Sequence, residues 1–346
     1  MKNRAYYNVI FGIISFALLL LFVINISLGS VSIPFVDVIR ILLGASSGET
    51  VYELIVLKSR LPQSLTAILA GSALSLCGLI MQTYFRNPLA DPSVLGISAG
   101  SSLGVAILFM FPAFISLSAS NSGFVWQNAS IIVASLIGAT VVLVLIIIFS
   151  GFVRNHVMLL VLGIMISAIA GSFIGILSVF NVSENVHAYA VWGLGSFSMV
   201  TMEHMKFFAP MVVLGLIFSV GLMKPLNVLL LGEKQAVNLG VNIKSVRLKI
   251  LIIVGFLTAI ITAYCGPIAF LGLAIPHMSR LLFKTSNHAV LIPASVLLGA
   301  LLALLCTLIS KLPGLNNALP INAITSLFGA PIVIWIILKR TNSEKT

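Results

Sequence analysis

The sequence predicts an all-α protein that crosses a membrane many times, and three observations lead to this prediction. Of its 346 residues, 60% are hydrophobic and only 8% are charged, whereas about a quarter of the residues are charged in soluble domains. The mean hydropathy is +1.18. The apolar residues also gather in runs of about 20 residues, the length that an α-helix needs to cross a bilayer. We therefore expect a polytopic membrane protein with about ten transmembrane helices.

Ten apolar runs are expected to be the spans. Lys2 and Arg4 precede the first run, which could also be a secretory signal peptide, but it is longer than a usual signal core of about 7 to 15 residues and is taken as a retained span. The whole chain, 1–346, is expected to form a single transmembrane domain. The expected spans lie near residues 7–28, 62–85, 92–111, 125–151, 157–180, 204–223, 250–264, 267–283, 288–310 and 322–338.

Three segments between the spans are more polar. Residues 29–61 suit an amphipathic segment at the membrane surface. Residues 184–203 are too interrupted to span and are expected to form a short surface helix. Residues 224–247 form a long basic loop, in which Gly232 and Gly240 can turn between short helices.

The basic residues predict the orientation of the spans. If the N-terminus is cytoplasmic, fourteen of the nineteen lysines and arginines fall on the cytoplasmic side, including those of the loop 224–247. Cytoplasmic loops of membrane proteins carry such an excess. With ten spans both termini are then cytoplasmic, and the net charge of +11 needs no nucleic acid to explain it.

The polar elbow between the second and third spans is the most distinctive stretch. Arg86 and Asn87 precede Pro88, which should end the second span because proline has no backbone N–H and disfavours helix at the residue before it. Asp91 is expected to cap the third helix, with Pro92 at the first helical position. The sequence thus predicts a tight hairpin between two spans.

Small residues recur at four-residue spacing on three of the expected helices. Such ladders let two helices approach closely in a membrane, and they could also form small faces along a central passage; the sequence leaves both interpretations open. The ladders are Gly96, Gly100 and Gly104; Gly163, Ser167, Gly171 and Gly175; and Ala67, Gly71 and Ser75.

Residues for catalysis or for binding a cofactor are not recognisable. No Gly-Lys dipeptide occurs, so a phosphate-binding loop of the GxxxxGK[ST] kind is absent and any ATP must be hydrolysed by another chain. The five histidines have no ligand-like spacing, and no metal site is expected. The three cysteines, Cys77, Cys265 and Cys306, fall inside apolar runs and are expected to be buried. An enzyme is therefore disfavoured.

Ordered short motifs extend from about residue 55 to the C-terminus. They are Arg60-Leu61-Pro62; Ala70-Gly71-Ser72-Ala73-Leu74 leading to Gln82; Arg86-Asn87-Pro88-Leu89-Ala90-Asp91-Pro92 with Leu95-Gly96; Leu231-Gly232-Glu233 with Ala236 and Leu239-Gly240; Gly266-Pro267-Ile268-Ala269-Phe270-Leu271-Gly272-Leu273 with Pro276-His277 and Arg280; and Leu319-Pro320 followed by Gly329-Ala330-Pro331. In this order they resemble the FecCD-type permeases of binding-protein-dependent ABC importers for iron-siderophores, haem and cobalamin.

The resemblance implies an assembly and a location. It implies the type II ABC importer architecture, a homodimer of ten-helix subunits in the lipid of the bacterial cytoplasmic (inner) membrane, and a translocation path at the dimer interface. The implied partners are a second copy of the chain, two ATP-binding cassette subunits that use the ATP, and an extracytoplasmic substrate-binding protein. A heterodimer with a paralogous permease stays open, as does the choice among siderophore, haem and cobalamin.

The resemblance also implies roles for particular residues. Arg60 and Lys311 match positions that dock the binding protein, with Lys311 replacing the family's arginine. Asn155 and His156 match the place where the path closes on the cytoplasmic side, although an ordinary basic turn is an alternative. The residues implied in ATPase coupling are Leu231, Gly232, Glu233, Ala236, Leu239 and Gly240.

Three stretches depart from the family pattern. Gln63 follows Arg60-Leu61-Pro62 in place of arginine, Thr307 replaces a usual acidic residue, and Asn322 ends the stretch Ala318-Leu319-Pro320-Ile321-Asn322 in place of glycine. These differences weaken any transfer of substrate identity from a relative. A self-sufficient secondary transporter, recognised by dependence on a proton gradient, and an integral-membrane enzyme stay as alternatives.

Overall fold

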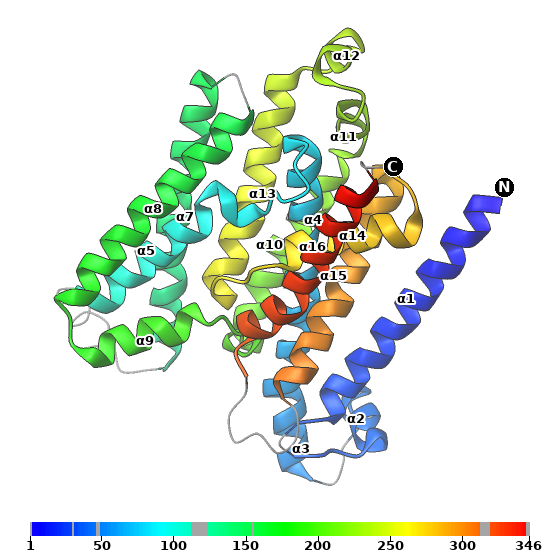
Figure 1. The fold of residues 1–346 in the computed structure, drawn as a ribbon. Coiled ribbons are helices and arrows are strands. Elements are labelled where there is room, and N and C mark those ends of the chain that lie inside the picture. Colours follow the sequence, from blue (N-terminus) through cyan, green and yellow to red (C-terminus); the bar gives the residue numbers. More distant parts are fainter. Residues whose placement is uncertain are drawn as a thin grey trace. The chain divides into compact units, whose positions relative to one another are not determined.

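The computed structural model describes residues 2–29, 31–45, 49–111, 124–153, 156–311 and 319–343 (Figure 1). All regular structure in these ranges is helical. The helices form two compact units, each assembled from distant parts of the sequence. The first comprises Met1–Leu79, Ser196–Leu216 and Ala269–Thr346, and the second Ile80–Gly195 and Ile217–Ile268.

Within the described ranges, seven helices are long and apolar enough to cross a membrane, and three shorter apolar helices accompany them. The predicted fold class, an all-α polytopic membrane protein, is confirmed. The seven are Arg4–Ser27, Thr50–Phe85, Ala129–Phe152, Val157–Val179, Met202–Val220, Ile243–Cys265 and His288–Ser310, and the shorter ones are Ile97–Met110, Leu271–Phe283 and Ile321–Ile334.

The first unit is organised around α15, which packs against α1, α14 and α16. Its apolar core includes Ile14 of α1, Ile275 and Phe283 of α14, and Leu298 of α15. The elements of this unit are α1 (Lys2–Ser27), α2 (Phe35–Leu42), α3 (Thr50–Ile55), the π-helix η1 (Val56–Arg60), most of α4 (Leu61–Phe85), the 3₁₀ turn η3 (Phe197–Met199), most of α10 (Met202–Val220), α14 (Leu271–Phe283), α15 (His288–Ser310) and α16 (Ile321–Ser343).

Small residues let α4 and α15 approach until their backbones touch. A Cβ atom added at Gly71 would overlap the carbonyl group of Gly299. On either side of this contact, the hydroxyl of Ser72 donates to the carbonyl oxygen of Val296 over 3.0 Å and that of Ser75 to the carbonyl oxygen of Ser295 over 2.7 Å. In a membrane, where neighbouring lipid is as apolar as a leucine, such packing and hydrogen bonding hold helices together.

The second unit is organised around α5, which packs against α7, α8, α9 and α13. Cys265 at the end of α13 and the two other cysteines are buried free thiols, as the sequence predicts. The elements of this unit are the end of α4, the 3₁₀ turn η2 (Pro92–Leu95), α5 (Ile97–Met110), α7 (Phe124–Phe152), α8 (His156–Val179), α9 (Ser183–Gly193), the end of α10, α11 (Met223–Leu229), α12 (Glu233–Asn238) and α13 (Ile243–Cys265).

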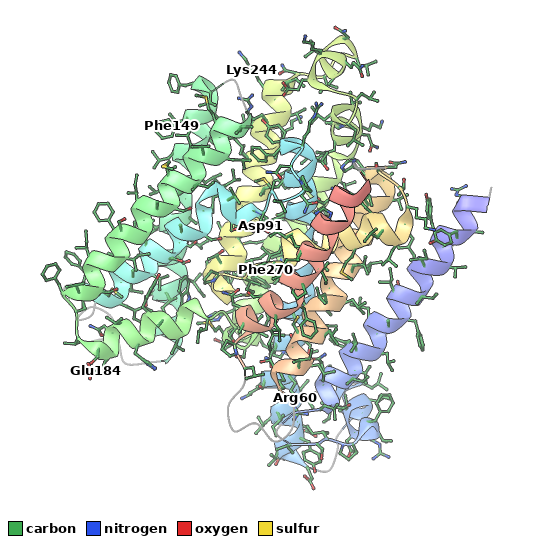
Figure 2. All side chains as sticks on the ribbon, in the orientation of Figure 1. Arg60, Asp91, Phe149, Glu184, Lys244 and Phe270 are labelled. Carbon is green, nitrogen blue, oxygen red and sulfur yellow. The ribbon has the colours of Figure 1, made fainter. Side chains whose placement is uncertain are left out.

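The backbone between α13 and α14 is not helical. Gly266 has a φ of +73°, and Phe270, labelled in Figure 2, has a φ of +69° just before α14 begins at Leu271. The left-handed region is uncommon for a bulky residue such as phenylalanine. Gly329 of α16 lies against this residue, where an added Cβ atom would overlap the Cβ of Phe270. Tight packing of α16 thus accompanies the unusual backbone of Phe270.

Candidate functional site

The elbow after α4 is built from local hydrogen bonds. α4 ends at Phe85, and Arg86 leaves the helix with a φ of +49°. The side-chain oxygen of Asn87 accepts a hydrogen bond from the backbone N–H of Leu89 over 2.9 Å, which closes a turn around Pro88. This is the behaviour of asparagine in Asx turns.

Asp91, labelled in Figure 2, caps a 3₁₀ turn and not an α-helix. Its carboxylate accepts from the backbone N–H of Ser93 over 3.1 Å and from the Ser93 hydroxyl over 2.6 Å. The turn from Pro92 ends at Gly96, whose φ of +80° cannot continue a right-handed helix, and α5 begins one residue later at Ile97. Asp91 is thus a cap with Pro92 at the first helical position, as the sequence predicts, but the helix that they open is a short 3₁₀ turn. The expectation that Gly96 lies within the third helix is wrong.

Some glycines of the small-residue ladders lie in close helix contacts, and others lie on open helix faces. Added Cβ atoms at Gly100 and Gly104 of α5 would overlap backbone atoms of α7, and one at Gly163 of α8 would overlap those of η2. These positions serve close packing. Gly171 and Gly175, farther along α8, have no neighbour within 4 Å of an added Cβ atom.

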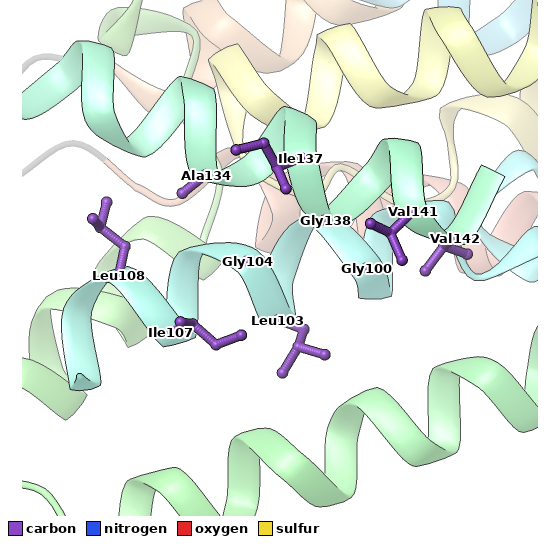
Figure 3. Close-up of a pocket in the computed structure, with 10 residues that line it drawn as sticks. All are labelled: Gly100, Leu103, Gly104, Ile107, Leu108, Ala134, Ile137, Gly138, Val141 and Val142. Carbon is purple, nitrogen blue, oxygen red and sulfur yellow. The ribbon is translucent and has the colours of Figure 1, made fainter. Parts of the chain in front are cut away.

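An apolar cleft of about 340 Å³ lies where α5 and α7 meet (Figure 3). Gly100, Gly104 and Gly138 line it, and the other lining residues are alanine, valine, leucine and isoleucine. Sites for polar ligands carry a few convergent polar groups that fix orientation. This cleft has none, so it is not a candidate site for a charged chelate.

The predicted coupling segment, residues 224–247, folds into α11, α12 and the first turns of α13. Gly232, with a φ of +116°, joins α11 to α12, where Glu233 is the first residue, and Gly240, with a φ of +82°, follows α12. Ala236 is fully buried. Its backbone N–H donates to the carbonyl oxygen of Gly232, and its own carbonyl oxygen accepts from the backbone N–H of Val241. Leu231 and Leu239, in contrast, are 58% and 62% exposed.

Arg86 connects the elbow to this segment. Its Nη2 atom donates a hydrogen bond of 2.9 Å to the carbonyl oxygen of Leu229, the last residue of α11. The final carbonyls of a helix have no partner within the helix, and a cation is favourable there because of the helix dipole. The elbow and α11 are thereby held together.

Arg247 makes the corresponding contact at the other end of the segment. From the start of α13, its Nη1 atom donates to the carbonyl oxygens of Ser150, over 2.9 Å, and Val153, over 2.7 Å. Ser150 lies in the last turn of α7, and Val153 directly follows its end at Phe152. Sequence reasoning missed this role, although a basic residue at a helix start, where the dipole disfavours it, is a signal that it has a partner elsewhere.

The residues predicted to close the path follow α7 directly. Asn155 lies outside the described residues. His156 is described only as the first residue of α8. Their predicted role stays a prediction. The described residue that precedes them is Val153, whose carbonyl oxygen accepts from Arg247.

Arg60 is buried and not a hydrated rim charge. Its side chain is 5% exposed and is labelled in Figure 2. Nη1 donates hydrogen bonds of 2.8 Å to the carbonyl oxygens of Ile26 and Ser27 at the end of α1, and Nη2 donates to that of Val31. Arg60 thus supplies donors to carbonyl oxygens at and just after the end of α1, where the helix itself supplies none. Its predicted role in docking stays a prediction.

Lys311 directly follows α15 and has a related environment. Its Nζ atom is buried and has no hydrogen-bond partner among the described residues. Burial and the nearby charge of Arg60 lower the pKa of Lys311 to about 8. The two residues implied in docking are thus brought together, one holding α1 and the other without a partner in the described part of the chain.

Comparison with known proteins places this arrangement in a family. The FecCD transport family matches residues 17–339, nearly the whole chain. This chain belongs to the FecCD transport family. The hemin transport system permease protein HmuU of Yersinia pestis is 30% identical over 349 residues, covering 98% of both chains. The vitamin B12 import system permease protein BtuC of Photorhabdus laumondii subsp. laumondii is 33% identical over 289 residues, covering 83% of this chain and 82% of that protein.

A solved structure shares the fold of this FecCD protein. It shows an inward-facing conformation of a transporter assigned to the metal-chelate ABC type, with a TM-score of 0.82 and 28% identity. The match covers 96% of this chain and 99% of that chain. The predicted family and the permease architecture are therefore confirmed.

Two departures from the FecCD pattern have local structural roles. The hydroxyl of Thr307 is buried and donates to the carbonyl oxygen of Ala303 within α15. The side-chain oxygen of Asn322 accepts from the backbone N–H of Ala269 over 3.2 Å, in the non-helical segment before α14. Asn322 therefore satisfies a backbone donor where apolar surroundings offer few partners.

No metal centre is formed by the described part of this FecCD chain. Its His, Cys, Asp and Glu residues include no group of three placed to hold a metal ion. His277 and His288 belong to α14 and α15. Among the site residues predicted from the sequence, His156 is the one histidine, and its side chain lies outside the described residues.

Proposed function

We propose that this FecCD protein is the transmembrane permease subunit of an ATP-driven importer that moves an iron-siderophore, haem or cobalamin into the cytoplasm. In this proposal two copies form the path, an extracytoplasmic binding protein delivers the substrate, and two separate ATP-binding cassette subunits hydrolyse the ATP. The chain itself is not an enzyme. The hemin and vitamin B12 relatives support this range of substrates.

The exposed apolar side chains in α12 and in the turns that join it to α11 and α13 are the observation that carries the proposal. Leu230, Leu231, Val237 and Leu239 are each between 48% and 62% exposed, although they lie in a basic loop predicted to be cytoplasmic. Clustered exposed apolar side chains outside a membrane mark a surface for another protein. Arg86 and the buried Ala236 hold these helices in place, so the surface is preformed.

We propose that the binding protein docks on the opposite, predicted outer side at Lys311. Burial leaves this ammonium without a hydrogen-bond partner in the described residues, and an acidic side chain of the binding protein would supply one. Arg60, near Lys311, would contribute to this site by holding the end of α1 in place through its hydrogen bonds to Ile26 and Ser27. Lysine lacks the planar fork that grips a carboxylate in two places, so this contact should be weaker than one from arginine.

Reconstitution tests the proposed function. The chain, its genetically adjacent ATPase and its binding protein would be placed in liposomes, and uptake of a ferric siderophore, haem and cobalamin would be measured with ATP inside. We expect uptake of one of the three. The matched control is an ATPase subunit whose ATP-binding lysine is changed, which should abolish it.

Other outcomes identify the alternatives. Uptake that continues with the inactive ATPase and collapses with the proton gradient would identify a secondary transporter and overturn the proposal. Chemical conversion of a substrate without its transport would identify an enzyme. Uptake of none of the three chelates by an assembly that still couples ATP hydrolysis to its binding protein would contradict the proposed substrate class.

A further inference from the structure

The short helix α2 exposes apolar side chains beside the end of a membrane span, α1 (Figure 1). Phe35 and Val36 of α2 are 55% and 57% exposed, and Leu43, which directly follows the helix, is 80% exposed. Ile39 and Leu42 are also exposed on this helix. Contact of so much clustered apolar surface with water is unfavourable, so this surface marks a contact with something other than water.

The chain that leaves α1 folds back on the end of that helix. The backbone N–H of Ile33 donates a hydrogen bond of 3.1 Å to the carbonyl oxygen of Ser27, the last residue of α1. Nη2 of Arg60 donates to the carbonyl oxygen of Val31 and Nη1 to that of Ser27. These contacts keep the segment before α2 at the level at which α1 ends.

The packing of α2 against α1 sets the depth of α2. Val38 and Ile41 are buried in an apolar core with Ile26 of α1, and Phe22 of α1 packs against the same core. Phe22 precedes the end of α1 at Ser27 by five residues, which is about 8 Å along an α-helix. Because α1 is long and apolar enough to cross a membrane, its last turns lie where acyl chains meet headgroups. α2 lies at the same boundary.

The side chains of α2 divide into three sides of the helix. With about 100° between successive residues, the exposed apolar residues share an arc of about 120° beside the buried pair. Asp37 and Arg40 occupy the remaining side, where Nη1 of Arg40 lies 3.8 Å from Oδ1 of Asp37 and the Arg40 side chain is 59% exposed. A helix that lies in the plane of a membrane surface has its apolar and charged sides separated in this way.

We propose that α2 is a membrane anchor whose exposed apolar side inserts among the phospholipids at the surface where α1 ends. Acyl chains contact Phe35, Val36 and Leu43, and Arg40 lies at the level of the headgroups, where its guanidinium can pair with a phosphate. A protein-binding surface has an apolar centre within a polar rim, whereas the charges of α2 lie on one side only. The sequence predicted a surface segment over residues 29–61, and this proposal assigns the insertion to one side of one helix within it.

The anchor fixes the depth of the end of α1, which Arg60 also holds. It does not depend on the proposed transport function, because any membrane protein with this packing would place α2 at the bilayer surface.

Depth-dependent quenching of a fluorescent label tests the anchor. The full chain in phospholipid nanodiscs would carry one label at Val36→Cys, at Leu43→Cys or at Arg40→Cys; the native cysteines are buried, so labelling should be selective. Nitroxides at the top of the acyl chains quench from within the bilayer, and iodide quenches from water. We expect the nitroxides to quench the labels at residues 36 and 43 several-fold more than the label at residue 40, the matched control on the charged side. Iodide should show the reverse order.

A charge placed on the apolar side should release the helix. In the Leu43→Cys protein, Val36→Asp should cause loss of most nitroxide quenching, because a carboxylate is unfavourable among acyl chains. Arg40→Gln, a change on the charged side, should leave the quenching at residue 43 as it is in the parent. Equal quenching in the Val36→Asp and Arg40→Gln proteins would contradict the anchor.

The other occupants of this surface give different results. Equal quenching by each quencher at residues 36 and 40 would overturn the proposal. Iodide quenching at residue 36 that disappears when the binding protein is added would identify a protein-docking surface instead. Protection from both quenchers in nanodiscs with two copies of the chain, but not in nanodiscs with one, would show that a second copy covers α2 and would also overturn the proposal.

Discussion

At the scale of single residues, three buried polar side chains differ in their hydrogen-bond partners. The carboxylate of Asp91 accepts within a local turn, and the guanidinium of Arg60 donates to distant carbonyls. The ammonium of Lys311 has no hydrogen-bond partner among the described residues. A buried polar group without a partner costs more than a satisfied one contributes. Substitutions at these positions should therefore differ in sign and size.

Asp91 should tolerate asparagine better than alanine. Burial raises the pKa of its carboxyl, and the hydrogen bonds from Ser93 oppose that change. Asparagine can accept the same bonds without a charge, so Asp91→Asn should melt close to the parent. Asp91→Ala removes the acceptor and should lower the free energy of unfolding by about 1 kcal/mol. Thermal melting in detergent measures both, and equal melting of the parent and the alanine variant would contradict the capping role.

Lys311 should make stability depend on pH in the alkaline range. Its folded pKa of about 8 lies below the ordinary value of 10.5, so the folded state binds fewer protons between these limits. Stability from this residue therefore rises as pH increases from about 8 towards 10.5. The melting temperature of the parent, relative to Lys311→Met, should be higher at pH 10 than at pH 7. A difference that is the same at both pH values would show that Lys311 does not titrate in this way.

At the scale of helices, short connections determine which elements can act together. Gly232 and Gly240 allow α11, α12 and α13 to follow one another closely, and Arg60 fixes the end of α1. These contacts lie at helix ends, where carbonyls and N–H groups lack partners within the helix. Changes there should affect coupling or docking of a helix more than the helix itself.

Gly232→Val should uncouple ATP hydrolysis from transport while the spans stay inserted. The φ of +116° is one that a side chain strains whatever the surrounding space, at a cost of about 1 to 3 kcal/mol. Gly240→Val should act in the same direction. Gly12→Ala in α1 is the control, since it has no positive φ and no neighbour within 4 Å of an added Cβ atom. ATPase activity and uptake should be measured together, and normal transport per ATP in Gly232→Val would refute this prediction.

Arg60→Ala should loosen the end of α1. The variant removes the guanidinium donor from the carbonyls of Ile26, Ser27 and Val31, of which Ser27 keeps the backbone N–H of Ile33. The loss should be about 3 kcal/mol, the upper value for one hydrogen bond to a charged group. Arg60→Lys should lose less because it keeps a donor. Protease cleavage between α1 and α2 would report the loosening. If cleavage rates match in all three proteins, the guanidinium does not hold this helix end.

At the scale of the whole molecule, the proposed docking of a binding protein should depend on Lys311. Interface charges act strongly on association rates, so Lys311→Glu should slow association. The effect should shrink at high salt, because charges are screened beyond a Debye length of about 8 Å at physiological ionic strength. Association kinetics in nanodiscs at two salt concentrations provide the measurement. Lys58→Glu is the control for charge alone, and an equal effect of both changes would exclude a specific role for Lys311.

The sequence by itself determined the class of the protein. Helix and membrane insertion depend on composition and on runs of about 20 apolar residues, which are local properties of the chain. The ordered motifs, from Arg60-Leu61-Pro62 to Gly329-Ala330-Pro331, identified the family. Their order along the chain can be read without knowing which residues they contact. The elbow was also local enough to be predicted, apart from the 3₁₀ turn that Gly96 ends.

Only the tertiary structure decided which partner each cation takes. The sequence pointed to docking for Arg60 but not to its bonds with carbonyls about 30 positions away. Arg247 was counted only as a basic residue, although it holds the end of α7. Every residue has a backbone carbonyl acceptor, so the sequence does not indicate which carbonyl a side chain will contact. Their availability depends on where helices end and which ends meet, and this is fixed only when the helices pack.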